Sequence, residues 1–202
     1  MSLTTYAGVQ QAIADELHRD DLTSYIPDWI TLAESRINKL LRVRQMETST
    51  PSTMAAGVIA VPTNYVALKD AYISSTQPYT NLERKTANWI YDNYPNRVAD
   101  NTPKFIAREG SNFIFGPYPD SNYTVTLVYW NRLAALSTGT NAVFLAYPGL
   151  WLFGALAESA PWLKADSRIA VWEAKFNDLV RQVQDEDDDE FLSGSTMRMV
   201  AG

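Results

Sequence analysis

The last quarter of the chain, residues 141–189, constrains the fold most tightly. Residues 147–163 are almost wholly apolar and include Gly154 among several alanines. A helix that is apolar on all sides is usually buried, and its small residues allow neighbouring helices to approach closely. Residues 166–183 follow with an amphipathic pattern. Their apolar stripe is Ile169, Trp172, Phe176, Leu179, Val180 and Val183. This quarter therefore predicts a helical hairpin that packs, rather than a site that reacts.

Two further amphipathic helices are predicted near the N-terminus. Thr4 or Thr5 can cap the first, which runs to about His18. The second begins near Pro27, a residue suited to the first helical position. Its apolar stripe is Ile26, Trp29, Ile30, Ala33, Ile37, Leu40 and Leu41. We expect residues 1–45 and 136–192 to form one antiparallel helical bundle, built from the N- and C-terminal helix pairs.

The middle of the chain, residues 46–135, loses the helical period and is β-rich. Short strands are expected at 58–62 and 70–74, and a short helix at 86–94. A hairpin with Gly110 in its turn and a longer strand at 123–130 follow. The predicted fold class is α+β, mainly α: a helical bundle with an inserted β-rich region. Residues 193–202 lack periodicity and are expected to form a flexible tail.

Composition excludes several classes of protein. The absence of cysteine excludes a disulfide framework, a thiol nucleophile and Cys-ligated metal sites. A net charge of −6 argues against binding nucleic acid by phosphate neutralisation. Arg36, Lys39, Arg42 and Arg44 form a local basic cluster, so contact with an acidic partner stays open. The longest apolar run is interrupted and too short for a bilayer, and no signal peptide precedes it. We therefore expect a soluble protein with no membrane partner.

No catalytic, cofactor-binding or metal-binding residue is predicted. His18, the one histidine, lies at a predicted helix end, where a structural role is expected. The acidic run 185–190 lacks the glycine and spacing of a calcium loop, and is expected to be a solvated, fraying helix end. The chain has no Gly-rich phosphate loop or nucleophile elbow. We expect a protein that is not an enzyme, although a cell-wall hydrolase whose acids converge only in the fold, or a regulator that binds DNA through 36–44, stays open.

Several segments of the chain occur together and in order. From the N-terminus they are Leu3-Thr4-Thr5-Tyr6, Asp20-Asp21-Leu22, Ile26-Pro27-Asp28-Trp29-Ile30, Ala33-Glu34-Ser35-Arg36-Ile37-Asn38, Leu41-Arg42-Val43-Arg44-Gln45-Met46-Glu47, Val61-Pro62, Asn64-Tyr65, Tyr147-Pro148, Leu152-Phe153-Gly154-Ala155-Leu156-Ala157-Glu158, Ala160-Pro161 and Trp172-Glu173. Each consists of common residues, and their joint presence carries the similarity. In this combination the chain resembles the head-to-tail adaptor (connector) proteins of short-tailed bacteriophages.

The resemblance implies a structural protein of the virion, located at the portal vertex and made in the host cytoplasm. Similar adaptors form a homo-oligomeric ring, usually a dodecamer, between the portal and the tail, and the ring extends the DNA channel. The implied partners are further copies of the chain, the portal protein, tail or nozzle proteins, and DNA that passes through without sequence-specific binding. No catalytic residue carries over. A different tail or head-completion protein is the alternative.

Two site hypotheses accompany this resemblance. A flexible terminus can dock on a partner and fold only on binding, so the tail is expected to bind the portal. The residues concerned are Ser193, Gly194, Met197, Arg198, Met199 and Val200. An acidic channel wall would repel phosphate and let DNA slide, so the acidic run is expected to face the channel. Its residues are Asp185, Glu186, Asp187, Asp188, Asp189 and Glu190.

Overall fold

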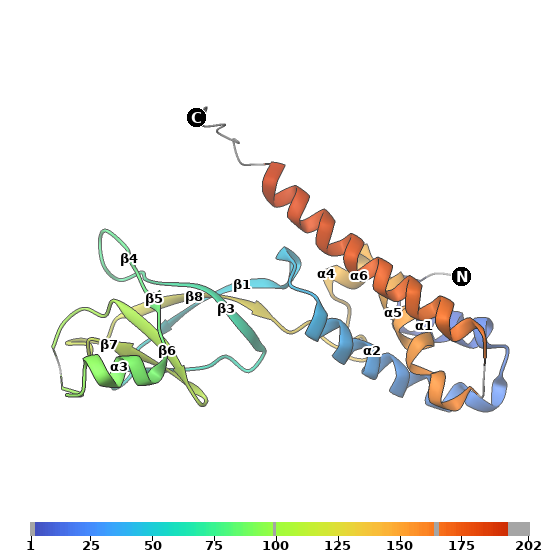
Figure 1. Cartoon of the computed structure of the whole chain (residues 1–202), viewed down its shortest axis with the longest axis horizontal. Coiled ribbons are helices and arrows are strands. Elements are labelled where there is room, and N and C mark those ends of the chain that lie inside the picture. Colours follow the sequence, from blue (N-terminus) through green and yellow to red (C-terminus); the bar gives the residue numbers. More distant parts are fainter. Residues whose placement is uncertain (1–2, 99, 164–165, 194–202) are drawn as a thin grey trace. The chain divides into compact units, whose positions relative to one another are not determined.

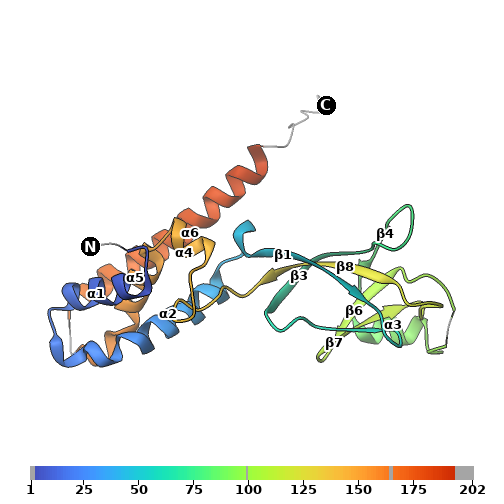
Figure 2. The ribbon, with the colours of Figure 1, turned by 180° about the vertical axis from the view of Figure 1, so that it is seen from behind.

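A computed structural model of the chain describes residues 3–98, 100–163 and 166–193 (Figures 1 and 2). The chain divides into two compact units. The helical unit contains the residues up to Met46 and those from Leu133 onward, and the β unit is Glu47–Arg132.

The helical unit consists of long helices joined by short ones. Thr5 caps the first helix as predicted, since its Oγ1 accepts the N–H of Gly8 at 3.1 Å. The α-helices are α1 (Tyr6–Leu17), α2 (Ile26–Leu40), α4 (Ala142–Ala146), α5 (Gly149–Glu158) and α6 (Arg168–Ser193). The 3-10 helices are η1 (Asp20–Tyr25), η2 (Arg44–Met46) and η3 (Ala160–Trp162).

Helix α5 forms the centre of this unit, as its apolar sequence predicts. Leu150, Trp151 and Leu156 are buried. A side chain at Gly154 would place its Cβ 3.0 Å from the Cβ of Ala33 and 3.1 Å from the ring of Phe176. Glycine therefore lets α5 approach α2 and α6 at the same point, and burial of its apolar surface supplies the main stabilisation of the unit.

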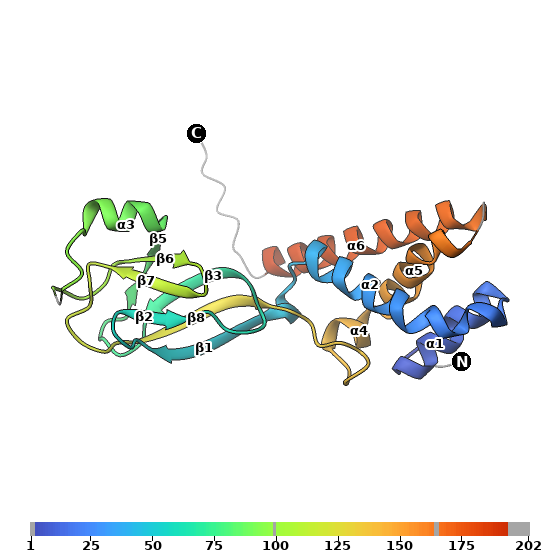
Figure 3. The same cartoon turned by 90° about the horizontal axis from the view of Figure 1, so that it is seen from below.

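Helices α2 and α6 run in the same direction (Figure 3). Contacts between them advance together along both helices: Arg36 contacts Glu173, the carbonyl of Leu40 accepts from Gln184, and Arg44, just beyond α2, contacts Asp187. The predicted antiparallel pairs join helices from the same end of the chain, so the direction of α2 relative to α6 was not part of that prediction. Amphipathic stripes show which face of a helix is buried, but not the direction of its neighbour.

The β unit contains two four-stranded sheets. The first has the order β1-β8-β3-β4, with strands β1 (Glu47–Thr53), β8 (Thr124–Asn131), β3 (Tyr65–Ile73) and β4 (Thr80–Asn81). The second has the order β2-β7-β6-β5, with strands β2 (Val58–Ala60), β7 (Asn112–Gly116), β6 (Phe105–Glu109) and β5 (Glu83–Arg84). The predicted hairpin is confirmed as β6 and β7, with Gly110 in its turn at a φ of 57°.

The two sheets enclose a hydrophobic core of their own. Val125, Leu127 and Tyr129 alternate along β8 and are buried on one face, as predicted for this strand. Phe113 and Phe115 of β7 contribute from the second sheet. The short helix α3 (Ala87–Asn93) packs Ile90 against Ala107 and Ile114, on a separate cluster of the second sheet. The β unit is therefore a packed body rather than a set of loops.

The predicted fold class, a mainly α bundle with a β-rich insertion, is wrong. Within the described residues, eight strands build two complete sheets, so a sheet-rich body takes the place of the inserted region. One reason is β1, whose sequence Glu-Thr-Ser-Thr-Pro-Ser-Thr contains no apolar residue and gives no alternating signal. It becomes a strand by pairing along its whole length with β8, a contact distant in sequence.

Candidate functional site

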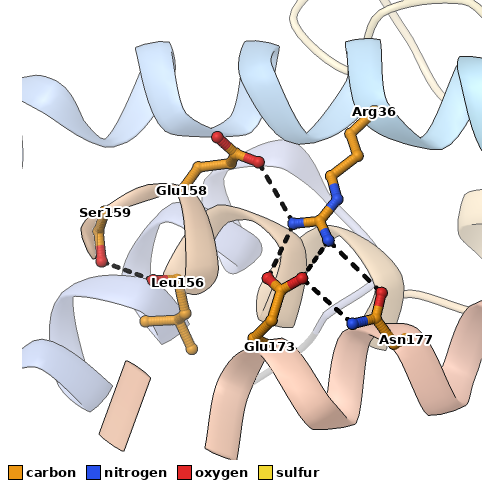
Figure 4. Close-up of polar contacts among 6 residues, drawn as sticks. All are labelled: Arg36, Leu156, Glu158, Ser159, Glu173 and Asn177. Carbon is orange, nitrogen blue, oxygen red and sulfur yellow. Dashed lines mark hydrogen bonds and ion pairs between the residues drawn. The ribbon is translucent and has the colours of Figure 1, made fainter. Parts of the chain in front are cut away.

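The basic cluster predicted around Arg36 and Arg44 is used inside the helical unit. Arg36 of α2 lies between carboxylates of α5 and α6 (Figure 4). Its Nη1 donates to Glu173 Oε2 at 2.9 Å and lies 3.5 Å from Glu158 Oε1, while its Nη2 also pairs with Glu173. The guanidinium stacks 4.4 Å from the ring centre of Phe176. One side chain thus connects three helices.

This pairing changes the protonation equilibria of both partners. The hydrogen bond from Arg36 lowers the pKa of Glu173 below its ordinary value, and partial burial opposes that effect only in part. The same hydrogen bond raises the pKa of Arg36, which stays charged. Asn177 donates to Glu173 at 3.1 Å and adds to the stabilisation of the carboxylate. At neutral pH the cluster is therefore a fixed ionic contact.

Polar groups also close the end of α5. The hydroxyl of the buried Ser159 donates to the carbonyl of Leu156 at 2.6 Å, as Figure 4 shows. A buried hydroxyl needs such a partner, and the bond satisfies an otherwise open carbonyl in the last turn of the helix. This end of α5 is therefore stably terminated beside the Arg36 cluster.

Arg44 holds the C-terminal part of α6. Its backbone N–H donates to Asp187 Oδ1 at 3.0 Å, its Nε lies 3.3 Å from the same oxygen, and it also pairs with Glu190. Arg42, by contrast, donates to the carbonyl of Asn38 at 2.9 Å. Arg36 and Arg44 therefore serve to attach α6 to α2, which argues against a phosphate-binding role for these two residues.

The structure divides the acidic run into two sets. Helix α6 continues through it to Ser193. The expectation of a fully solvated helix end is wrong for Asp187, whose side chain is 15% exposed and faces Arg44. Burial raises the pKa of Tyr147, and its hydrogen bond to Glu186 contributes further. Asp185, Asp188 and Asp189 remain exposed, so these three are the part of the run still available to face a channel.

The predicted portal-binding residues belong to the end of the chain. Ser193 is the last residue of α6. Gly194, Met197, Arg198, Met199 and Val200 lie outside the described residues. The structure therefore gives the starting point of this segment, at the end of a helix held by Arg44, and leaves its role as a prediction.

The structure also places the residues considered for catalysis, for metal binding and for a membrane span. His18 is exposed and ends α1, in the left-handed conformation. Over the residues that the structure describes, no group of three or more His, Cys, Asp or Glu side chains is placed to hold a metal ion. Within the same ranges no helix has both the length and the apolarity to cross a bilayer.

A groove that sequence reasoning missed lies between α1 and α6. It has a volume of about 450 Å³ and is lined by Leu3, Ala12, Asp15, Glu16, Leu152, Phe153, Leu156 and Lys175. Its apolar residues come mainly from α5, while Asp15 and Glu16 lie on the α1 side. Because three helices contribute, no local pattern could identify it. The one indication in the sequence is that 147–163 is apolar on nearly every side, so that part of this helix surface stays uncovered by its neighbours.

Comparison with known proteins gives one family. The family model described as SU10 adaptor protein matches residues 4–199, which include both compact units. No curated protein matches the chain.

The pairing of Glu173 with Arg36 should make stability depend on pH. Since the folded chain lowers the pKa of Glu173, its contribution is present above the ordinary carboxyl pKa of about 4.5 and is lost as the pH falls through the folded value. At neutral pH, Glu173→Gln should lower the free energy of unfolding by about 1 kcal/mol, because both side chains retain contact with solvent. The difference from the natural chain should shrink as the pH falls below the ordinary carboxyl pKa of about 4.5 and through the lowered pKa of Glu173.

Urea unfolding at a series of pH values measures this difference. Asp178→Asn serves as the matched control, because it removes a carboxylate of the same helix whose ion pair, with Arg181, is exposed to solvent. A difference between the natural chain and Glu173→Gln that stays constant with pH would contradict the assigned role of the pair.

Proposed function

Because the chain belongs to the SU10 adaptor protein family, we propose that it forms a ring between the portal and the tail of a phage virion and extends the DNA channel. The family match over residues 4–199 carries this proposal. The chain is accordingly a structural adaptor protein and a virion component. A ring of twelve copies is proposed on the resemblance to short-tailed phage connectors, and contact with tail or nozzle proteins on the same ground.

The charge of the chain supports a channel through which DNA moves without being bound. The net charge is −6, and the two arginines most suited to phosphate contact are engaged with carboxylates of α6. Strong binding of DNA requires free cations to replace the counterions of the phosphates. An acidic wall instead keeps the polymer mobile.

We propose that residues 193–202 bind the portal. The segment follows directly from α6, whose last turns are attached through Arg44 to Asp187 and Glu190. A segment that starts from a fixed point loses less freedom on docking than one that starts from a mobile helix. The attachment of α6 thus supports a role in presenting this segment to a partner.

Mixing the full chain with the cognate portal ring tests the proposal. Light scattering should show a stoichiometric complex with a ring of this chain. Deletion of 193–202 should weaken the complex at least tenfold, which corresponds to about 1.4 kcal/mol, while the circular dichroism spectrum and unfolding midpoint stay unchanged. Absence of any complex with the full chain would overturn the adaptor ring and favour another tail or head-completion role. Equal binding by the truncated chain would refute the tail contact alone.

The exposed part of the acidic run gives a second test. Changing Asp185, Asp188 and Asp189 to Asn should slow DNA packaging or ejection, because the channel wall would then repel phosphate less. The change leaves Asp187 and Glu190 in place to hold α6. Asp20, Asp21 and Asp28 changed to Asn provide the control, since they are exposed and alter the net charge equally. Equal packaging and ejection by both variants would contradict a channel-facing role.

A further inference from the structure

The groove between α1 and α6 leaves apolar surface only partly covered, with the ammonium of Lys175 4.8 Å from the ring centre of Phe153. Leu152 and Phe153 of α5 line it and are only partly buried. Val171 lies one turn before Lys175 on α6 and is 53% exposed. An open groove that has helices on two sides and the apolar helix α5 at its base has the shape that accepts a further helix.

Helix α2 and the turn before it present a partly exposed apolar shoulder in the same unit, where the ring of Tyr25 packs 5.9 Å from that of Trp162. Tyr25, Leu32 and Leu40 are 41%, 45% and 42% exposed. Leu32 and Lys39 are seven residues apart and lie on one side of α2, together with the exposed Asp28, while Leu40 lies about 80° round the helix from Leu32. Large apolar side chains that cluster at the surface mark sites of protein contact. This shoulder and the groove share no residue.

The acidic α1 side of the groove and the Lys39 end of the shoulder complement each other in charge, while Lys175 places a cation on the α6 side of the groove. The groove has the carboxylates Asp15 and Glu16 on its α1 side, and both side chains are exposed. The shoulder carries Lys39, which is exposed beside Leu40. A helix that inserts Leu32 and Leu40 into the groove can bring the ammonium group of Lys39 towards those carboxylates. Such complementarity fixes the register of a contact.

The shoulder cannot fill the groove of its own chain. Helix α2 already packs on α5, at Ala33 against Gly154, and Arg36 ties it to α6. We therefore propose that the α2 shoulder of one copy docks into the α1–α6 groove of the next copy. Because the two surfaces are different, the contact is heterologous and repeats from copy to copy, which closes into a ring when the rotation permits. This inference rests on the proposed ring and assigns the contact that builds it.

The absence of cysteine in the chain allows a specific cross-linking test. Lys39→Cys and Glu16→Cys are combined in one chain, and the assembled protein is treated with a short bis-maleimide reagent, each thiol adding to one maleimide. If the chain alone stays monomeric, it is first assembled on the portal ring. The expected product is a ladder of covalent oligomers. The control combines Glu16→Cys with Arg181→Cys, an exposed position on α6 outside both surfaces, and should give no ladder.

The outcomes separate this contact from the proposed function. A ring that forms, as measured by light scattering, but gives no ladder overturns the docking contact and leaves the adaptor ring intact. Failure to form a ring in either preparation overturns the proposed function and the contact that rests on it. A ladder from the Arg181→Cys control as well would show unspecific proximity and would also overturn the assignment.

Charge reversal supplies a second measurement with fully folded variants. Lys39→Glu and Glu16→Lys should each reduce ring formation about tenfold at low salt, and the two changes together should restore it. The double variant retains the net charge of −6, so restoration cannot come from a change in overall repulsion. Persistent loss in the double variant would contradict a direct contact between these positions.

Discussion

The arrangement of the helical unit depends on Arg36. This residue lies on α2, in the N-terminal part of the chain, and connects Glu158 of α5 with Glu173 of α6. The helices come from opposite ends of the sequence, so the contact joins the segments that precede and follow Glu47–Arg132 in the chain. Burial of apolar surface on α5 stabilises the unit, and the ionic cluster joins α2 and α6 in their parallel alignment.

Attachment of α6 determines what the acidic run can do. Arg44 engages Asp187 and Glu190, and Tyr147 hydrogen-bonds with Glu186, so these carboxylates are occupied within the unit. Asp185, Asp188 and Asp189 are left to act on a partner or on passing DNA. A run that reads in sequence as one uniform block therefore has a structural side and an exposed side, set by the helical period.

Local patterns predicted most of the individual elements. Thr5 at the first cap, Gly110 in the hairpin turn and the alternation of Val125, Leu127 and Tyr129 all depend on neighbours in sequence, so they were readable. The two-sheet body could not be predicted from local patterns, because a polar segment such as β1 becomes a strand only by pairing with β8. Pairing across the sequence must be known before such a strand can be recognised.

The candidate sites also divide into features that local sequence predicted and features that depend on contacts between distant segments. The sequence indicated the basic cluster and the acidic run separately, but their mutual pairing depends on the parallel packing of α2 and α6. The groove depends on three helices and had no sequence signal beyond the apolar excess of α5. The family resemblance, by contrast, was readable from the sequence, because the order of many short segments is itself a pattern. The family match confirms it.

Hydrogen exchange of the amides at 184–190 tests most directly whether the arginines fix α6. Arg44→Ala removes the side chain that contacts Asp187 and Glu190, and exchange there should become about tenfold faster, as expected for the loss of a charged hydrogen bond. Arg181→Ala is the control, because Arg181 is exposed and pairs within α6 with Asp178. Equal exchange rates at 184–190 in the natural chain and in Arg44→Ala would contradict the account.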